Sequence, residues 1–153
     1  LKRIIVTDRP YQGFFQTFMY TIWKRRHGQP DLVPVTGIQV KSEIARPVLN
    51  EVVPAKSKYR VFGAAWAGEL EVAKVEVSTD GGKTWTDAKL LGKAAPYTWQ
   101  FWEHEWQTPE RAGRHILMAR ATDSRGHKQP MERDEDRRDA VITHVLPIEI
   151  EVR

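Results

Sequence analysis

Two adjacent arginines, Arg137 and Arg138, are the residues in this sequence that are best suited to chemistry. They lie in a charged segment, Glu132–Asp139, which holds three basic and five acidic residues. A guanidinium presents a planar fork of N–H donors that binds an oxyanion through two parallel hydrogen bonds. The alternative is that aspartates of the same segment hold both arginines in ion pairs within a solvated loop. The spacing alone leaves both interpretations open.

The sequence indicates no other catalytic or metal-binding constellation. The absence of cysteine excludes disulfides, cysteine-ligated zinc, iron–sulfur clusters and a cysteine nucleophile. There is no Gly-x-Ser-x-Gly elbow and no phosphate-binding loop. Glu103 and Glu105 share one face of a predicted strand, where a solvated surface is favoured over a glycosidase pair. The histidines lack the spacing of a metal site: His27, His104, His115, His127 and His144.

The stretch Ser78–Trp85 matches the Asp-box pattern Ser-x-Asp-x-Gly-x-Thr-Trp at every fixed position. We expect Asp80 to accept hydrogen bonds from backbone N–H groups across a turn, and Trp85 to pack beneath it. Sialidase-like propellers carry this box once per blade, whereas here it occurs once in a chain too short for a propeller. We therefore assign the box a structural role and no chemistry.

Basic charge is concentrated at the start of the chain. Residues 1–30 hold six basic side chains and one acidic side chain, for a net charge of +5, and the remaining residues have a net charge of −1. Such an arm could bind an acidic surface, but the rest of the chain lacks the basic stripe with interleaved aromatics that nucleic-acid binding needs. No apolar run reaches the length of a membrane helix. We expect neither a nucleic-acid nor a membrane partner.

The elements that must position these residues are predicted to be strands. Val and Ile together number 23 against eight Leu, which favours pleated strands. Short strands separated by turn residues are typical of an all-β, immunoglobulin-like β-sandwich, which we assign to residues 36–153. Pro147 interrupts the last strand, at an edge or a bulge. The candidate strands are Ile38–Ile44, Tyr59–Trp66, Glu71–Ser78, Trp85–Leu91, Thr98–Trp106, His115–Thr122 and Val141–Val152.

Residues 1–35 form an irregular N-terminal arm in this interpretation. Lys2–Val6 could be one strand, and the aromatic segment Tyr11–Trp23 has no clean periodicity. Such a segment is a poor independent unit, so we expect it to lie across another surface, such as a neighbouring domain. The alternative is a lead-in that packs on the body of its own chain.

The strand Thr98–Trp106 carries large aromatic side chains on both faces. Trp102 shares one face with His104, and Trp99 shares the other with Phe101 and Glu103. The opposite sheet of the sandwich must cover one of these faces. The other face must be covered by the arm, another domain or a second copy of the chain.

Several segments, in order, resemble the C-terminal dimerisation domain of the sulfite oxidase family of molybdenum enzymes. The resemblance covers about residues 36–152, and Leu1–Gly13 is similar to the segment that closes the family's cofactor domain. The matching segments are Ser42–Pro47, Val61–Gly68, Val72–Val77, Ser78–Trp85, Trp99–Trp102 with Trp106 and Pro109, Ala119–Asp123 with Gln129–Pro130, and Pro147–Val152.

This resemblance implies a homodimer, and a molybdenum-cofactor domain that lies upstream and outside this chain. The family holds molybdenum through a dithiolene and one cysteine thiolate, so a chain without cysteine is expected neither to bind molybdopterin nor to oxidise sulfite by itself. The resemblance also implies that Arg138 binds substrate, as the arginine of the family's Asn-x-Arg-Gly segment does. Here Asp136 and Asp139 stand where the family has Asn and Gly. The compartment stays open between periplasm and cytoplasm.

A second hypothesis is an immunoglobulin-like binding module that stacks a carbohydrate or a peptide on surface tryptophans. An exposed row of tryptophans would favour it, and burial of most of them would remove it. The candidates are Trp66, Trp99, Trp102 and Trp106.

Overall fold

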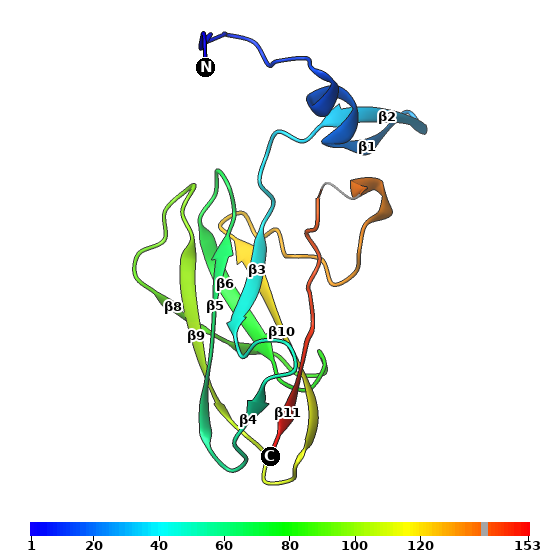
Figure 1. Cartoon of the computed structure of the whole chain (residues 1–153). Coiled ribbons are helices and arrows are strands. Elements are labelled where there is room, and N and C mark those ends of the chain that lie inside the picture. Colours follow the sequence, from blue (N-terminus) through cyan, green and yellow to red (C-terminus); the bar gives the residue numbers. More distant parts are fainter. Residues whose placement is uncertain (139–140) are drawn as a thin grey trace. The chain divides into compact units, whose positions relative to one another are not determined.

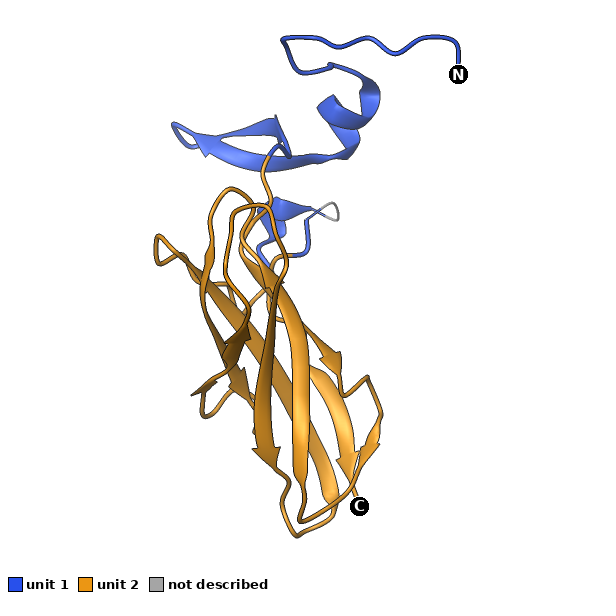
Figure 2. Ribbon diagram, turned by 90° about the vertical axis from the view of Figure 1, so that its left-hand side faces the viewer, with its two compact units in different colours: residues 1–36, 133–142 blue, residues 37–132, 143–153 orange. Residues whose placement is uncertain are grey.

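The computed structural model describes residues 1–138 and 141–153, in two compact units that Figure 2 draws in blue and orange. The first unit comprises residues 1–36 and 133–142, and the second comprises residues 37–132 and 143–153. Asp139, one possible partner of the paired arginines, lies outside the described residues. The proposed domain boundary after residue 35 remains a prediction.

The second unit is a sandwich of two sheets, and Figure 1 labels its strands except β7. Neighbouring strands pair antiparallel, except that β4 and β11 pair parallel. One sheet has four strands in the order β3 (Lys41–Arg46), β5 (Lys58–Trp66), β9 (Gln100–Gln107) and β8 (Lys89–Leu91). The other has five, in the order β4 (Val52–Val53), β11 (Ile148–Val152), β10 (Gly113–Asp123), β6 (Val72–Ser78) and β7 (Thr86–Asp87). This architecture confirms the predicted immunoglobulin-like β-sandwich.

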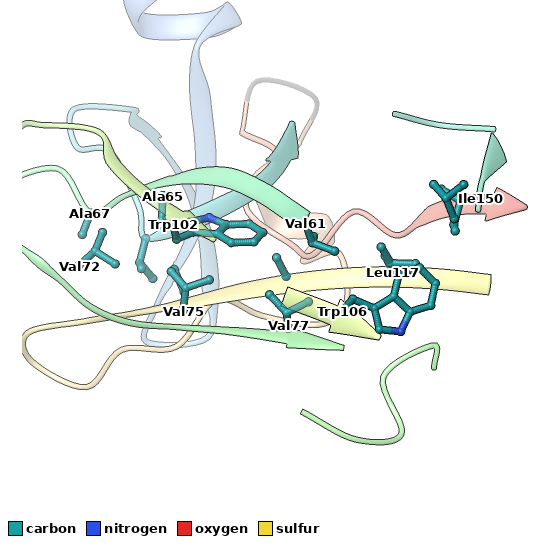
Figure 3. Packing of buried hydrophobic residues seen from close by; sticks show 14 of the residues in the cluster. Val61, Ala65, Ala67, Val72, Val75, Val77, Trp102, Trp106, Leu117 and Ile150 are labelled. Atoms are coloured by element: carbon teal, nitrogen blue, oxygen red, sulfur yellow. The ribbon is translucent and has the colours of Figure 1, made fainter. Parts of the chain in front are cut away.

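The core lies between the two sheets and is centred on Trp102, which is fully buried (Figure 3). The indole packs across β5 at Gly63, where a Cβ would lie 2.3 Å from Trp102 Cζ2 and 2.1 Å from the carbonyl oxygen of Glu43. Glycine is therefore required at position 63 because the Glu43 carbonyl and the Trp102 indole both occupy the space of a side chain, and not because of its backbone angles. Val61 and Ala65 on β5 and Val75 on β6 complete the inner layer around the indole.

Gln129 joins the two sheets at a buried point. Its side-chain Oε1 accepts a hydrogen bond from the backbone N–H of Ser42 on β3 at 2.8 Å and another from the N–H of Ala121 on β10 at 3.2 Å. The side chain is almost completely buried. One amide oxygen therefore satisfies one backbone donor of each layer.

Strand positions from the sequence agree with the sandwich except at four places, of which the first is β4, a strand that no candidate covers. The candidate Trp85–Leu91 is two short strands, because the chain passes from β7 in one sheet to β8 in the other at Ala88. The candidate Val141–Val152 is a strand from Ile148 on, directly after Pro147, and its described residues before that proline are not in a strand. The candidate Ile38–Ile44 begins and ends later in the structure, where the strand is Lys41–Arg46.

The first unit differs from the irregular arm that we expected. Lys2–Val6 is not a strand, because no described strand pairs with it. A short π-helix, η1 (Phe15–Met19), precedes a hairpin of β1 (Thr21–Arg26) and β2 (Gln29–Pro34). The unit also contains a single 3₁₀ turn, η2 (Glu135–Arg137). Among the described residues of the chain, no helix has the length and apolar character that crossing a bilayer requires.

Candidate functional site: an aromatic sheet face and an arginine segment

The outer face of the four-stranded sheet carries stacked aromatic rings. Alternate residues of β5 and β9 point away from the core, because successive side chains of a strand lie on opposite faces. Phe62 stacks on Phe101 with ring centroids 5.7 Å apart, and Trp66 stacks on Trp99 at 5.6 Å. The predicted division of the Thr98–Trp106 segment is confirmed, with Trp102 in the core and Trp99 and Phe101 outside.

These rings are exposed to an extent that is unusual for aromatic side chains. Trp99 is 68% exposed and Phe101 is 46% exposed. Contiguous apolar surface on a sheet face marks a site of contact with another molecule. Ala64 pairs with Phe101 in the ladder and adds a small residue to the same face. The part of this face at the end of β5 and around the start of β9 is therefore apolar. We call its residues the aromatic patch: Phe62, Ala64, Trp66, Trp99 and Phe101.

The rest of this face is charged. Lys58 pairs with Glu105 at 2.8 Å, and Glu103 pairs with Arg60 at 2.9 Å and with Lys89 at 3.2 Å. Hydrogen bonds from Lys89 and Arg60 lower the pKa of Glu103, so its carboxylate is ionised at neutral pH. The two glutamates expected to share a face do so, and both are in ion pairs.

His104 lies beside these charges in a cavity of about 370 Å³ that is also lined by Tyr59 and Asp87. Burial lowers the pKa of His104. The described residues contain no group of three His, Cys, Asp or Glu side chains arranged to hold a metal ion.

The outer face of the five-stranded sheet has a different character. Glu76 on β6 is paired with Arg120 at 3.0 Å, with Lys128 at 3.3 Å and with Lys74 at 3.4 Å. Burial of the carboxylate raises its pKa, but the hydrogen bonds from Arg120, Lys128 and Lys74 outweigh burial and lower the pKa to about 2. Arg120 also covers the Trp85 ring at 3.9 Å. The centre of this face is thus occupied by its own charge network.

The Asp box forms the turn that its pattern predicts. Asp80 Oδ1 accepts hydrogen bonds from the backbone N–H groups of Lys83 and Thr84 at 3.0 and 2.9 Å, and Asp80 Oδ2 accepts one from the Thr84 hydroxyl at 2.6 Å. The Trp85 indole N–H donates to the carbonyl of Gly82. These contacts lower the pKa of Asp80, chiefly through the hydrogen bonds from Thr84. The carboxylate holds the turn together.

Arg138 contacts the start of the hairpin in the first unit. Its Nη1 donates to the carbonyl oxygen of Phe18 at 2.6 Å and to the hydroxyl of Thr21, and its guanidinium lies 5.6 Å from the Phe18 ring centroid. Arg137 instead pairs with Asp134 at 3.2 Å. The ion-pair alternative is therefore correct for Arg137. For Arg138 the structure gives a backbone carbonyl and a hydroxyl as partners, which the sequence spacing did not indicate.

The four tryptophans considered for ligand stacking do not form one exposed row. Trp102 is fully buried and Trp106 is 7% exposed, whereas Trp66 and Trp99 lie on the outer face. A sandwich whose sheet face is apolar at one end and charged at the other belongs to the class of β-domains that carry an interaction surface.

Comparison with known families gives the identity of this domain. Residues 33–138, well over half of the chain, match the family described as the Mo-co oxidoreductase dimerisation domain, and the chain belongs to that family. It is an Mo-co dimerisation domain similar to those of sulfite oxidase and nitrate reductase.

Individual relatives agree with this assignment. A sulfite oxidase of Gallus gallus is 36% identical over 99 residues, and an NADH nitrate reductase of Phaseolus vulgaris is 28% identical over 153 residues. The matches cover 61% and 85% of this chain but 21% and 17% of those proteins. The sulfane dehydrogenase SoxCD of Paracoccus pantotrophus has the same fold, with a TM-score of 0.72 at 24% identity over 93% of this chain and 37% of its own.

Proposed function

We propose that this chain joins two subunits of a molybdenum-cofactor oxidoreductase as a homodimer, and that the subunits meet through the outer face of the four-stranded sheet. The aromatic patch is the observation that carries the proposal. Burial of such side chains contributes about 25 cal/mol per Å² of apolar area, whereas an exposed ion pair contributes about 1 kcal/mol or less. Apolar residues at the core of a contact with charged residues beside them are typical of protein interfaces.

Sedimentation of the chain tests this proposal. We expect the wild-type chain to sediment at twice its 17.7 kDa mass over a micromolar concentration series. Phe101→Glu should be monomeric over the same series, because it would place a carboxylate at the centre of the buried apolar area. A wild-type chain that stays monomeric at every concentration contradicts the proposal.

Ile116→Glu is the matched control. Ile116 is 42% exposed, close to the 46% of Phe101, and lies on the outer face of the other sheet. This variant should remain a dimer. If it dissociates and Phe101→Glu does not, the interface is on the other sheet.

We further propose that the parent enzyme binds its molybdenum cofactor outside this chain. The family's molybdenum ligand is a cysteine thiolate, and this sequence has none, so its donor set does not fit the metal. The first unit supports a neighbour of this kind. Among its described residues Thr21 alone is buried, while Tyr11, Phe14, Phe15 and Tyr20 are each more than half exposed. A two-stranded hairpin without a core needs another surface to be stable, and we propose that the cofactor domain supplies it.

We also propose that Arg138 binds an oxyanion through the guanidinium nitrogens other than Nη1, because Nη1 donates its hydrogen bond to the Phe18 carbonyl oxygen. The support is the family resemblance of its segment and the bidentate geometry of guanidinium groups. Sulfate should shift the NMR signal of the Arg138 side chain at concentrations that leave Arg137 unchanged, and Arg138→Gln should lose this response. Arg137→Gln is the control, since Asp134 holds Arg137. Equal responses of both arginines would contradict the assignment.

A further inference from the structure

Charges on the outer face of the four-stranded sheet are sorted by strand. The outward cations Lys58 and Arg60 lie on β5, and the outward anions Glu103 and Glu105 lie on the neighbouring strand β9. The face therefore has a positive column directly beside a negative column. This arrangement, which builds on the proposed dimer, specifies how a second copy can be oriented on it.

The register of β5 and β9 fixes which residues lie at the same height. On the outer face Arg60 pairs with Glu105, Phe62 with Glu103, and Ala64 with Phe101. The first pair joins a cation to an anion, and the last joins a small residue to a large one. A second copy whose β5 lies over β9 of the first copy would match the members of these two pairs with their complements, and would place Phe62 opposite Glu103, which Arg60 and Lys89 of its own copy already neutralise.

A two-fold axis that runs parallel to the strands, between β5 and β9, produces this superposition. Rotation about that axis exchanges the two columns and keeps the height along the strands. Arg60 of each copy then faces Glu105 of the other, and Phe101 of each copy faces the small Ala64. Packed sheets lie about 10 Å apart, a gap that arginine and glutamate side chains bridge from opposite sides.

A two-fold axis in the same plane but perpendicular to the strands gives a worse arrangement. It reverses the height and lays β5 over β5 and β9 over β9. Arg60 of one copy, which lies on β5, then does not face Glu105 of the other, which lies on β9, so no cation–anion contact forms between the copies. The Arg60 and Glu105 side chains are 61% and 67% exposed, so they are available to a second copy while Glu103 and Lys58 hold them in place.

We propose that the second copy docks with this parallel axis, and that Arg60 and Glu105 are the residues that determine its orientation. Each dimer then contains two Arg60–Glu105 contacts between subunits at one height along the strands, and two contacts in which Phe101 packs over Ala64 four residues further along. Charge pairs of this kind select the correct partner more than they add affinity.

A charge-swap experiment tests the orientation. Arg60→Glu brings two carboxylates together at each contact of its own dimer, and Glu105→Arg brings two guanidinium groups together. Each variant alone should dimerise about tenfold more weakly or worse than wild type, as expected for like charges at a contact. Mixed one to one, the two variants should form a heterodimer of near wild-type affinity, because both contacts again join a cation to an anion. Native mass spectrometry of chains with different tags distinguishes heterodimer from homodimer.

The controls separate this inference from the proposed function. Arg114→Glu reverses a charge on the other sheet, at a side chain that is 82% exposed, and should leave dimerisation unchanged. Thermal unfolding of each variant checks that its monomer is folded. A wild-type dimer that neither variant weakens, or weakened variants that mixing does not restore, overturns the orientation while the pairing function stands. A monomeric wild type overturns the pairing function itself.

Discussion

Trp102→Ala should lower the free energy of unfolding by about 3–5 kcal/mol, the usual cost of removing a large aromatic side chain from a packed core. The indole is fully buried and packs on Gly63, so the space it leaves lies between two sheets that cannot close over it without moving towards each other. Small domains have about 5–15 kcal/mol of stability in total, so this variant should lose a large fraction of it.

Urea unfolding followed by far-ultraviolet circular dichroism measures this loss. Trp99→Ala is the matched control, because it removes the same side chain from a position that is 68% exposed. At protein concentrations below those that support dimers, Trp99→Ala should change the stability by less than about 1 kcal/mol. Equal losses for the two variants would show that the core is not centred on Trp102.

The second large effect concerns how the free energy of unfolding changes as the pH is lowered. Glu76 has a pKa of about 2 in the folded chain, against its ordinary value of 4.5. A carboxylate with a lowered folded-state pKa contributes stability that is present above the unfolded pKa and is lost as the pH falls through the folded pKa. Wild type should therefore lose roughly 2–3 kcal/mol more than Glu76→Gln between pH 5 and pH 2.

Unfolding free energies of both chains across this pH range test the prediction. At pH 7, Glu76→Gln should be the less stable chain, because Arg120 and Lys128 lose their shared carboxylate. The two curves should converge near pH 2. Glu71→Gln, which changes an exposed glutamate, should keep the wild-type pH dependence. Parallel curves for wild type and Glu76→Gln would contradict the role given to the network.

Much of the sandwich could be predicted because its strands alternate cleanly. The placement of Trp102 and Phe101 on opposite faces of their strand followed from a period of two residues alone, whereas which face is the core did not. The split at Ala88 was missed because a change of sheet leaves no local signal when the flanking residues are all compatible with strands. Lys2–Val6 has the composition of a strand, but pairing depends on a partner and not on composition.

The hairpin of the first unit was missed although its turn left a signal. His27 and Gly28 both have positive φ, as a two-residue hairpin turn requires, and the His-Gly pair lies between segments that each carry apolar residues. The aromatic residues before it obscured the alternation. The contact of Arg138 with Phe18 joins residues 120 positions apart, and sequence spacing gives no access to such a pair.

The shared oxygen of Gln129 has a consequence for how the sandwich opens. Ser42 and Ala121 belong to different layers, yet both of their amides donate to that single atom. If β3 moves away, Gln129 Oε1 loses the hydrogen bond from Ser42, and if β10 moves away, it loses the one from Ala121. Local opening of either strand beside Gln129 therefore leaves a buried acceptor with one hydrogen bond fewer. The two hydrogen bonds therefore couple the opening of β3 to that of β10 at this point, which opposes the exposure of the inner surfaces of a subunit-pairing domain one layer at a time.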